Sequence, residues 1–180
     1  FIMYIIFKPK SFKADNFNYY GFVEDDIWNC VDYDEAKWPM SYATFFSKKD
    51  TITEYASGAT IMTYMKYSEV AEWSETYNTV SNPAERGESY EAFKEKKAQQ
   101  LLDAVSVKFP EMRASIKSYY TSTPLTYKDY MGTDDGAIYG IMKDYKEPIK
   151  TFISPRTKIQ NLLLTGQNII LHGVLGVTLS

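Results

Sequence analysis

The sequence predicts an α+β fold in which a mixed, largely antiparallel sheet carries helices on one face. Two observations predict it: several short segments rich in β-branched and aromatic residues, and one long segment whose apolar residues recur with helical spacing. With 180 residues, of which 44% are hydrophobic and 24% charged, the chain can bury a substantial core. Strands that come in a run before the long helix favour an α+β architecture over alternating βα units.

The expected strands are bounded by polar, Pro-containing or Gly-containing turns. The first ends at Lys8-Pro9-Lys10, and in the fourth Ile61 and Met62 point to opposite faces. An acidic segment that carries Trp28 and Trp38 predicts an irregular connection anchored by aromatic side chains. The five strand segments are residues 1–7, 17–23, 42–46, 59–65 and 116–123.

Three helix starts follow the first four strands. Ser68 followed by Glu69 predicts a short helix over 68–73, because a hydroxyl caps free amides and an acid complements the helix dipole. Asn82-Pro83-Ala84-Glu85 has the cap, first-turn proline and acid of a second helix start. The longest helix is expected over 90–109, where Pro110 ends it.

Composition excludes several classes of site. The net charge of −3 and the scattered Lys and Arg residues present no basic stripe, so we expect no nucleic-acid partner. Cys30 and His172 are the only residues of their types, which excludes a Cys/His zinc cluster, and no metal site is predicted. The lone cysteine indicates a cytoplasmic protein. Aromatic residues make up 16% of the chain and suit either a ligand groove or a sheet–helix core.

The last third of the chain concentrates glycine, with six of nine glycines after residue 130. An expected strand over 162–164 leads into the turn at Gly166 and Gln167, and a helix then begins at His172-Gly173. Gly173 and Gly176 would let that helix approach a planar or anionic ligand, although the same spacing also suits close packing. The uncharged residues 162–179 are interrupted by polar groups, which argues against a membrane span.

A second glycine-containing cluster precedes it. Thr123-Pro124-Leu125-Thr126, Asp129-Tyr130 and residues 136–140 form either a close-approach loop around Tyr139 or a turn-rich connection. Together with Ser154-Pro155-Arg156-Thr157 and the 164–177 motif, this order of residues resembles the C-terminal part of flavin-dependent phytoene desaturases, carotenoid isomerases and especially retinol saturases. The resemblance is strongest over 116–180.

The resemblance implies a two-domain flavoprotein that presents a polyene or isoprenoid substrate to FAD. Residues 1–150 would belong to the substrate-binding domain, and 151–180 would supply the last strand, turn and helix of the FAD domain. The implied flavin contacts are Gly166, Gln167, His172, Gly173, Gly176 and Val177. Related enzymes often have an acid where Gln167 stands, so its charge is absent here. Tyr139 and Tyr130 are the implied substrate contacts.

The catalytic residues stay unknown, with His172 and Tyr139 as acid–base candidates. No G-x-G-x-x-G follows any strand, so the pyrophosphate-binding element of FAD is missing. The first residues lack an initiating Met and the features of a signal peptide, so we expect a fragment that is inactive alone and does not retain FAD. The lipid-soluble substrate also implies peripheral membrane contact. The alternative is a non-enzymatic, aromatic-lined module that binds an apolar ligand or a protein.

Overall fold

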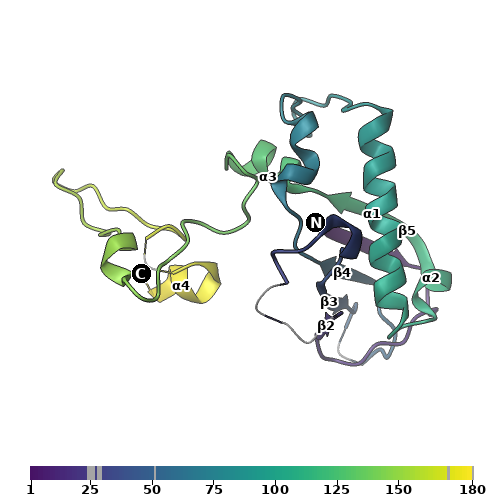
Figure 1. Cartoon of the computed structure of the whole chain (residues 1–180). Coiled ribbons are helices and arrows are strands. Elements are labelled where there is room, and N and C mark those ends of the chain that lie inside the picture. Colours follow the sequence, from purple (N-terminus) through teal and green to yellow (C-terminus); the bar gives the residue numbers. More distant parts are fainter. Residues whose placement is uncertain (24–26, 28–29, 51, 170, 180) are drawn as a thin grey trace. The chain divides into compact units, whose positions relative to one another are not determined.

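The computed structural model describes residues 1–23, 27, 30–50, 52–169 and 171–179 (Figure 1). It divides into two compact units, unit 1 (Phe1–Gly136) and unit 2 (Ala137–Ser180). This division falls earlier in the chain than the expected boundary between residues 150 and 151. The assignment of the two parts to a substrate domain and an FAD domain stays a prediction. Trp28 lies outside the described residues.

Unit 1 is built on one five-stranded sheet with the order β2-β3-β4-β1-β5. Each described strand coincides with a predicted strand segment, and all neighbouring strands are antiparallel. The expected parallel component is therefore wrong for the described residues. The strands are β1 (Ile2–Phe7), β2 (Tyr19–Phe22), β3 (Ser41–Ser47), β4 (Gly58–Met62) and β5 (Ile116–Ser122).

One face of this sheet is covered by α1 (Glu88–Ser106), as predicted (Figure 1). Leu101 and Val105 are fully buried against Met3 and Ile61 in one hydrophobic core. The helix ends before the predicted residue 109, and the amides of Lys108 and Phe109 both donate to the carbonyl of Val105 in a closing turn. The core exists because strand alternation and helix periodicity present their apolar residues to the same interface.

The helix expected from Asn82 does not form. Thr79 and Asn82 exchange backbone hydrogen bonds of 3.2 Å, and Ala84 N donates to the side chain of Asn78 (3.2 Å). These bonds fold residues 78–84 into a turn, because local side-chain acceptors compete with the helical pattern. The short helix expected over 68–73 is a 3-10 helix, η2 (Tyr67–Trp73).

The sequence analysis missed α3 (Pro124–Met131), which follows β5 directly. Thr123 and Thr126 form a reciprocal capping box, Pro124 occupies the first turn, and Gly132 closes the helix with φ 69°. Each of these is a sequence signal for a helix of this length. The remaining short helices of unit 1 are η1 (Glu35–Lys37) and α2 (Met112–Ser115).

Unit 2 is largely irregular. It contains η3 (Pro148–Thr151) and α4 (Gly173–Leu179), and the latter coincides with the expected C-terminal helix. The strand expected over 162–164 is not formed: its only β-pairing in the described residues is an isolated bridge between Arg156 and Leu163. A strand needs neighbours on which to pair, and the described part of unit 2 contains no sheet.

Truncating Leu101 to Ala tests whether α1 holds the core of unit 1. The side chain is fully buried, so we expect Leu101→Ala to lower the free energy of unfolding by about 2–5 kcal/mol in a urea titration. Lys96→Ala, on the exposed side of the same helix, should change it by less than about 0.5 kcal/mol. Equal effects of both substitutions would contradict the packing described.

Candidate functional site

Two loops of unit 2 meet in a cluster that contains most of the predicted ligand contacts. The ring of Tyr139 lies 4.7 Å from that of His172, centroid to centroid, at an angle of 44°. Ile141 N donates to Asn168 Oδ1 (2.8 Å), and the amide of Gln167 donates weakly to the carbonyl of Ile138 (3.5 Å). The structure thus brings together the two glycine-containing segments that the sequence analysis treated separately. We call residues 138–141, 166–169 and 171–173 the C-terminal cluster.

Polar bonds hold this cluster in place. A Cβ on Gly140 would lie 2.1 Å from Asn168 Oδ1, so only glycine lets the Asn168 side chain reach the backbone of Ile141. Lys143 Nζ donates to the carbonyls of Thr151 (2.8 Å), Asn168 (2.7 Å) and Ile169 (3.0 Å). The Lys143 ammonium group therefore bonds three loop carbonyls, and each of its three N–H donors has an acceptor.

The predicted flavin contacts fall into two groups by environment. Gly166 (φ 117°) and Gly173 (φ 79°) adopt the conformation that favours glycine, and no atom lies within 4 Å of a Cβ at either position. Their bare backbone is open to a ligand, beside the exposed imidazole of His172. Gly176 is instead buried, since a Cβ there would meet Leu171 at 2.6 Å, and Val177 next to it is half-buried.

These environments bear on whether FAD could be held here. Bare backbone at Gly166 and Gly173, the amide of Gln167 and the ring of His172 fit the hydroxyls and the flat ring of a flavin. The seven-residue α4 and the absence of G-x-G-x-x-G provide no site for the pyrophosphate. The cluster therefore fits part of FAD, and its role in binding stays a prediction.

The two predicted substrate tyrosines lie in different units. Tyr139 belongs to the C-terminal cluster and is 51% exposed. Tyr130 lies in α3 of unit 1, where its hydroxyl accepts a hydrogen bond from Val80 N (2.8 Å) while the side chain stays 56% exposed. This bond ties α3 to the loop that precedes α1. Substrate contact by either tyrosine stays untested.

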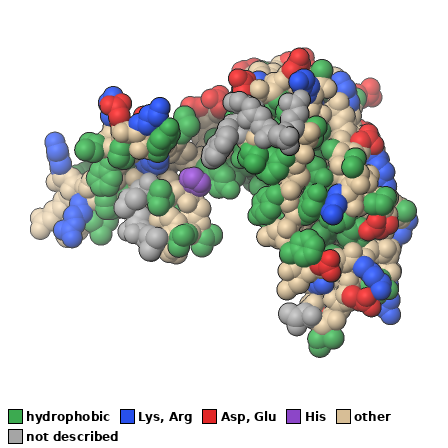
Figure 2. Space-filling model, turned by 60° about the horizontal axis from the view of Figure 1, so that its bottom comes forward, with side chains coloured by type: hydrophobic (Ala, Val, Ile, Leu, Met, Phe, Trp, Pro, Cys, Tyr) green, Lys and Arg blue, Asp and Glu red, His purple; other side chains and the backbone are tan. Residues whose placement is uncertain are grey.

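The face of the sheet opposite α1 carries an aromatic surface that the sequence analysis did not single out. Tyr4 and Tyr120 are direct neighbours across β1 and β5, with exposures of 43% and 66%. On the other side of Tyr4, Thr60 separates it from Phe45, whose ring packs edge-on against Tyr20 (6.2 Å between centroids). Hydrophobic side chains gather in patches on the molecular surface (Figure 2). We define the open sheet face as Tyr4, Ile6, Tyr20, Phe22, Phe45 and Tyr120.

Helix α3 is fixed beside this face by a buried ion pair. Arg86 contacts Asp129, and their side chains are only 3% and 2% exposed. Asp129 Oδ2 also accepts from Asn78 N (2.9 Å), and Arg86 Nη1 donates to Thr76 O (2.9 Å). From α3, Tyr127 lies beside Tyr4 and Ser122, and burial raises the pKa of its phenol. The ion pair therefore positions one border of the open sheet face.

A second buried charge cluster lies on the helix-covered side. Lys97 of α1 is 1% exposed, contacts Glu69 of η2, and lies 4.7 Å from the ring centroid of Trp38. Tyr33 donates to Glu69 and accepts from Lys66 N (2.7 Å). Burial and the Glu69 carboxylate raise the pKa of Tyr33. This cluster joins α1, η2 and the segment that carries Tyr33 and Trp38. Its role is therefore structural.

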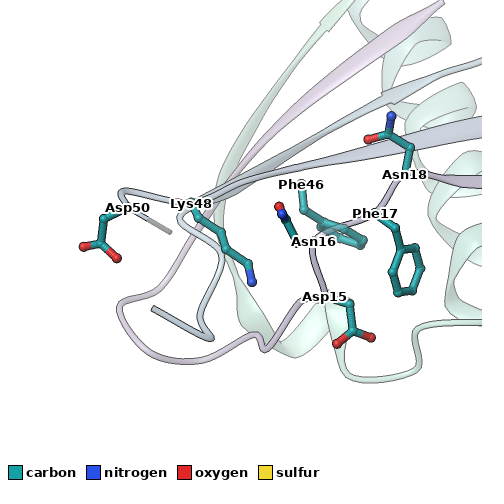
Figure 3. Close-up of a pocket in the computed structure, with 7 residues that line it drawn as sticks. All are labelled: Asp15, Asn16, Phe17, Asn18, Phe46, Lys48 and Asp50. Atoms are coloured by element: carbon teal, nitrogen blue, oxygen red, sulfur yellow. The ribbon is translucent and has the colours of Figure 1, made fainter. Parts of the chain in front are cut away.

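A surface hollow of about 400 Å³ lies far along the chain from the C-terminal cluster (Figure 3). Asp50 points away from the phenylalanine rings in that view, and its Oδ1 accepts from Ile52 N (3.0 Å) and Thr53 N (2.8 Å). Its carboxylate is therefore committed to a turn. The lining residues are Asp15, Asn16, Phe17, Asn18, Phe46, Lys48 and Asp50.

The described ranges contain neither a candidate metal centre nor a candidate membrane-spanning helix. Among these residues, no group of three or more His, Cys, Asp or Glu side chains is placed to hold a metal ion. No helix there has the length and apolar character needed to cross a membrane.

Comparison with known proteins finds relatives of low identity. An all-trans-retinol 13,14-reductase of Danio rerio is 28% identical over 179 residues, which cover 91% of this chain and 28% of that protein. The Homo sapiens protein of the same name is 28% identical over 141 residues, or 77% of this chain and 23% of the relative. A Danio rerio protein named inactive all-trans-retinol 13,14-reductase is 30% identical over 146 residues.

The chain spans about a quarter of the length of these relatives. No protein-family model and no solved structure matches it. The similarity extends over most of the chain, beyond the C-terminal third that carries the motif resemblance. The chain is thus similar to retinol reductases, whereas similarity to phytoene desaturases or carotenoid isomerases stays an expectation.

The Arg86–Asp129 pair gives a direct test of how α3 is held. Asp129→Asn leaves a buried guanidinium without its counter-charge, so we expect a loss of about 3–5 kcal/mol in the free energy of unfolding. Glu54→Gln breaks the exposed Lys13–Glu54 pair, with side chains 63% and 67% exposed, and should cost less than about 1 kcal/mol. A small effect of Asp129→Asn in chemical denaturation would show that α3 is held by other contacts.

Proposed function

We propose that this chain is the C-terminal, substrate-facing part of an FAD-dependent oxidoreductase that acts on a carbon–carbon double bond of a retinoid or related polyene. The observation that carries the proposal is the open sheet face, a row of exposed aromatic side chains on a sheet whose other face packs against α1. The retinol reductase names of the relatives supply the substrate class.

The surface suits such a substrate physically. A conjugated polyene is long, flat and apolar, and it offers almost no hydrogen-bonding groups along its length. Tyr4, Tyr20 and Tyr120 present exposed surface with little rotamer freedom to lose. Because the rings project from strands of one sheet, their spacing is fixed before a ligand arrives.

The C-terminal cluster is the part of the chain proposed to meet the cofactor. Gly166, Gln167, His172 and Gly173 would hold the ribityl chain and ring of FAD, while Gly176 and Val177 support them from the interior. When bound, FAD supplies hydride transfer to or from a carbon–carbon double bond. The residues of this chain bind, orient the reactants and exclude water. Alone, this chain is proposed to be inactive, because it lacks a pyrophosphate site.

The protein is proposed to be cytoplasmic and to touch a membrane surface where its apolar substrate is dissolved. The substrate class supports that contact.

A non-enzymatic binding module is the second candidate. It is favoured by one specific observation, that a relative 30% identical to this chain is named inactive. The open sheet face would then hold an apolar ligand without redox chemistry. The two candidates share the aromatic surface and differ in whether the C-terminal cluster contacts a flavin.

Replacing Tyr120 tests the surface that both candidates share. In the complete protein encoded by the gene, we expect Tyr120→Ala to weaken binding of all-trans-retinol about tenfold, because it removes the most exposed ring of the open sheet face, beside Tyr4. Tyr120→Phe should keep most of the affinity, since the ring stays. Val107→Ala, at a residue 88% exposed beyond the end of α1, is the control. Fluorescence titration with retinol measures all three, and unchanged affinity of Tyr120→Ala would exclude this face.

Flavin retention separates the two candidates. Gly173→Ala adds a side chain at φ 79° where the cluster is open to a ligand, and in the complete protein we expect it to lower the bound flavin absorbance near 450 nm at least severalfold. Gly87→Ala is the matched control, because Gly87 has φ 92° and equally open space at the start of α1. Equal flavin content in both variants and the unaltered protein would favour the binding module.

A further inference from the structure

One long edge of the sheet in unit 1 has no partner among the described residues. β5 pairs with β1 on one side, and no described strand pairs with its other side. It is seven residues long, contains no proline, and carries one charge, Lys117. The opposite edge strand, β2, has only four residues. Proteins normally shorten, charge or cover such an edge, because its free N–H and C=O groups can pair with another strand.

The hydrogen-bond pattern shows which backbone groups of β5 point outward. Phe1 and Thr63 exchange both of their backbone bonds (2.9 and 3.0 Å), and Phe7 N donates to Ser57 O (3.0 Å). Since bonding alternates along an antiparallel strand, odd-numbered residues of β1 bond toward β4 and even-numbered residues bond toward β5.

The register then transfers this alternation to β5. Ile2, Tyr4 and Ile6 lie opposite Ser122, Tyr120 and Ser118, which therefore bond to β1. The register shift between Ile6 and Phe7 places a β-bulge at Lys117, so the alternation holds from Ser118 onward. The backbone groups of Tyr119 and Thr121 point away from the sheet. Their two amides and two carbonyls, along an extended edge, are complementary to one further β-strand.

A surface hollow beside this edge has room for part of such a strand. A hollow of about 250 Å³ lies along it, lined by Glu91, Lys94 and Glu95 of α1 and by residues 119–121 of β5. Tyr119 donates to both oxygens of Glu95 (2.8 and 2.7 Å), which fixes the wall of the hollow. An added strand would pack its inward side chains against α1 and continue the covered layer.

We propose that the outer edge of β5 takes a sixth β-strand supplied by the same polypeptide from outside residues 1–180. This rests on the proposed function, in which the chain is part of a longer protein. The relatives support the source, because this chain covers only 23–28% of the length of the retinol reductases of Homo sapiens and Danio rerio. A strand of the same polypeptide also has the higher effective concentration at this edge.

Residue-resolved hydrogen exchange on the complete protein encoded by the gene tests the proposal. The amides of Ser118, Tyr120 and Ser122 bond to β1 and serve as internal standards for a paired strand. We expect the amides of Tyr119 and Thr121 to exchange about 100-fold or more slowly than unstructured amides, in the range of those standards, and independently of protein concentration.

Three outcomes would overturn the proposal. Fast exchange at the amides of Tyr119 and Thr121, with protected standards, would show a free edge. Protection that increases with protein concentration would show pairing with a second copy. A gene product that ends within residues 1–180 would remove the source of the strand. None of these readings depends on flavin or retinol, so a failure here is distinct from a failure of the retinol and flavin experiments.

Discussion

The double pairing of β1 is the constraint on which unit 1 depends. This strand bonds to β4 on one side and to β5 on the other, so segments separated by more than fifty residues meet on its two edges. Met3, Ile5 and Phe7 point into the core beneath α1, whereas Tyr4 and Ile6 point to the opposite face. Because a strand has only two faces, a register slip of one residue would exchange these sets. The packed core and the aromatic surface are therefore fixed by one strand.

Buried charges attach the remaining elements to this frame. Lys97 with Glu69 links α1 to η2, and Arg86 with Asp129 links α3 to the loop before α1. Neither pair is a strong source of net stability, since desolvation offsets much of the attraction. The pairs instead specify where the attached elements lie, because an alternative placement of α3 would leave a charge buried without a partner. The placement of α3 also fixes Tyr127 beside Tyr4.

Sequence patterns predicted the five strands of unit 1 well, because alternation and turn residues agree with the final sheet, whereas the strand expected over 162–164 did not form. They failed where local signals compete. Asn82 has the residue type of a helix cap, but Thr79 and Asn78 bond the nearby backbone groups in a turn and no helix forms. The helix at Pro124 was missed although its capping box is visible in the sequence. For the candidate site, the glycines around residue 173 were identified, but the contact of Tyr139 with His172 was not, because spacing in sequence does not show which loops meet.

The open sheet face was missed for a related reason. Its aromatic residues alternate with apolar core residues, so β1 and β2 are hydrophobic on both faces and give no contrast from which to identify an outward surface.

Unit 2 presents a different physical problem, because it is ordered with almost no core of its own. Among its described side chains, Ile169 is the only buried hydrophobic one, while Ile149 and Met142 are each 88% exposed. Hydrophobic burial cannot stabilise so small a unit unless other surfaces cover it. The polar bonds of Lys143 and Asn168 fix the loops locally but supply little net stability in water. A ligand or protein surface that covers the exposed apolar residues would therefore stabilise the C-terminal cluster, and binding and local folding in this unit are expected to be coupled.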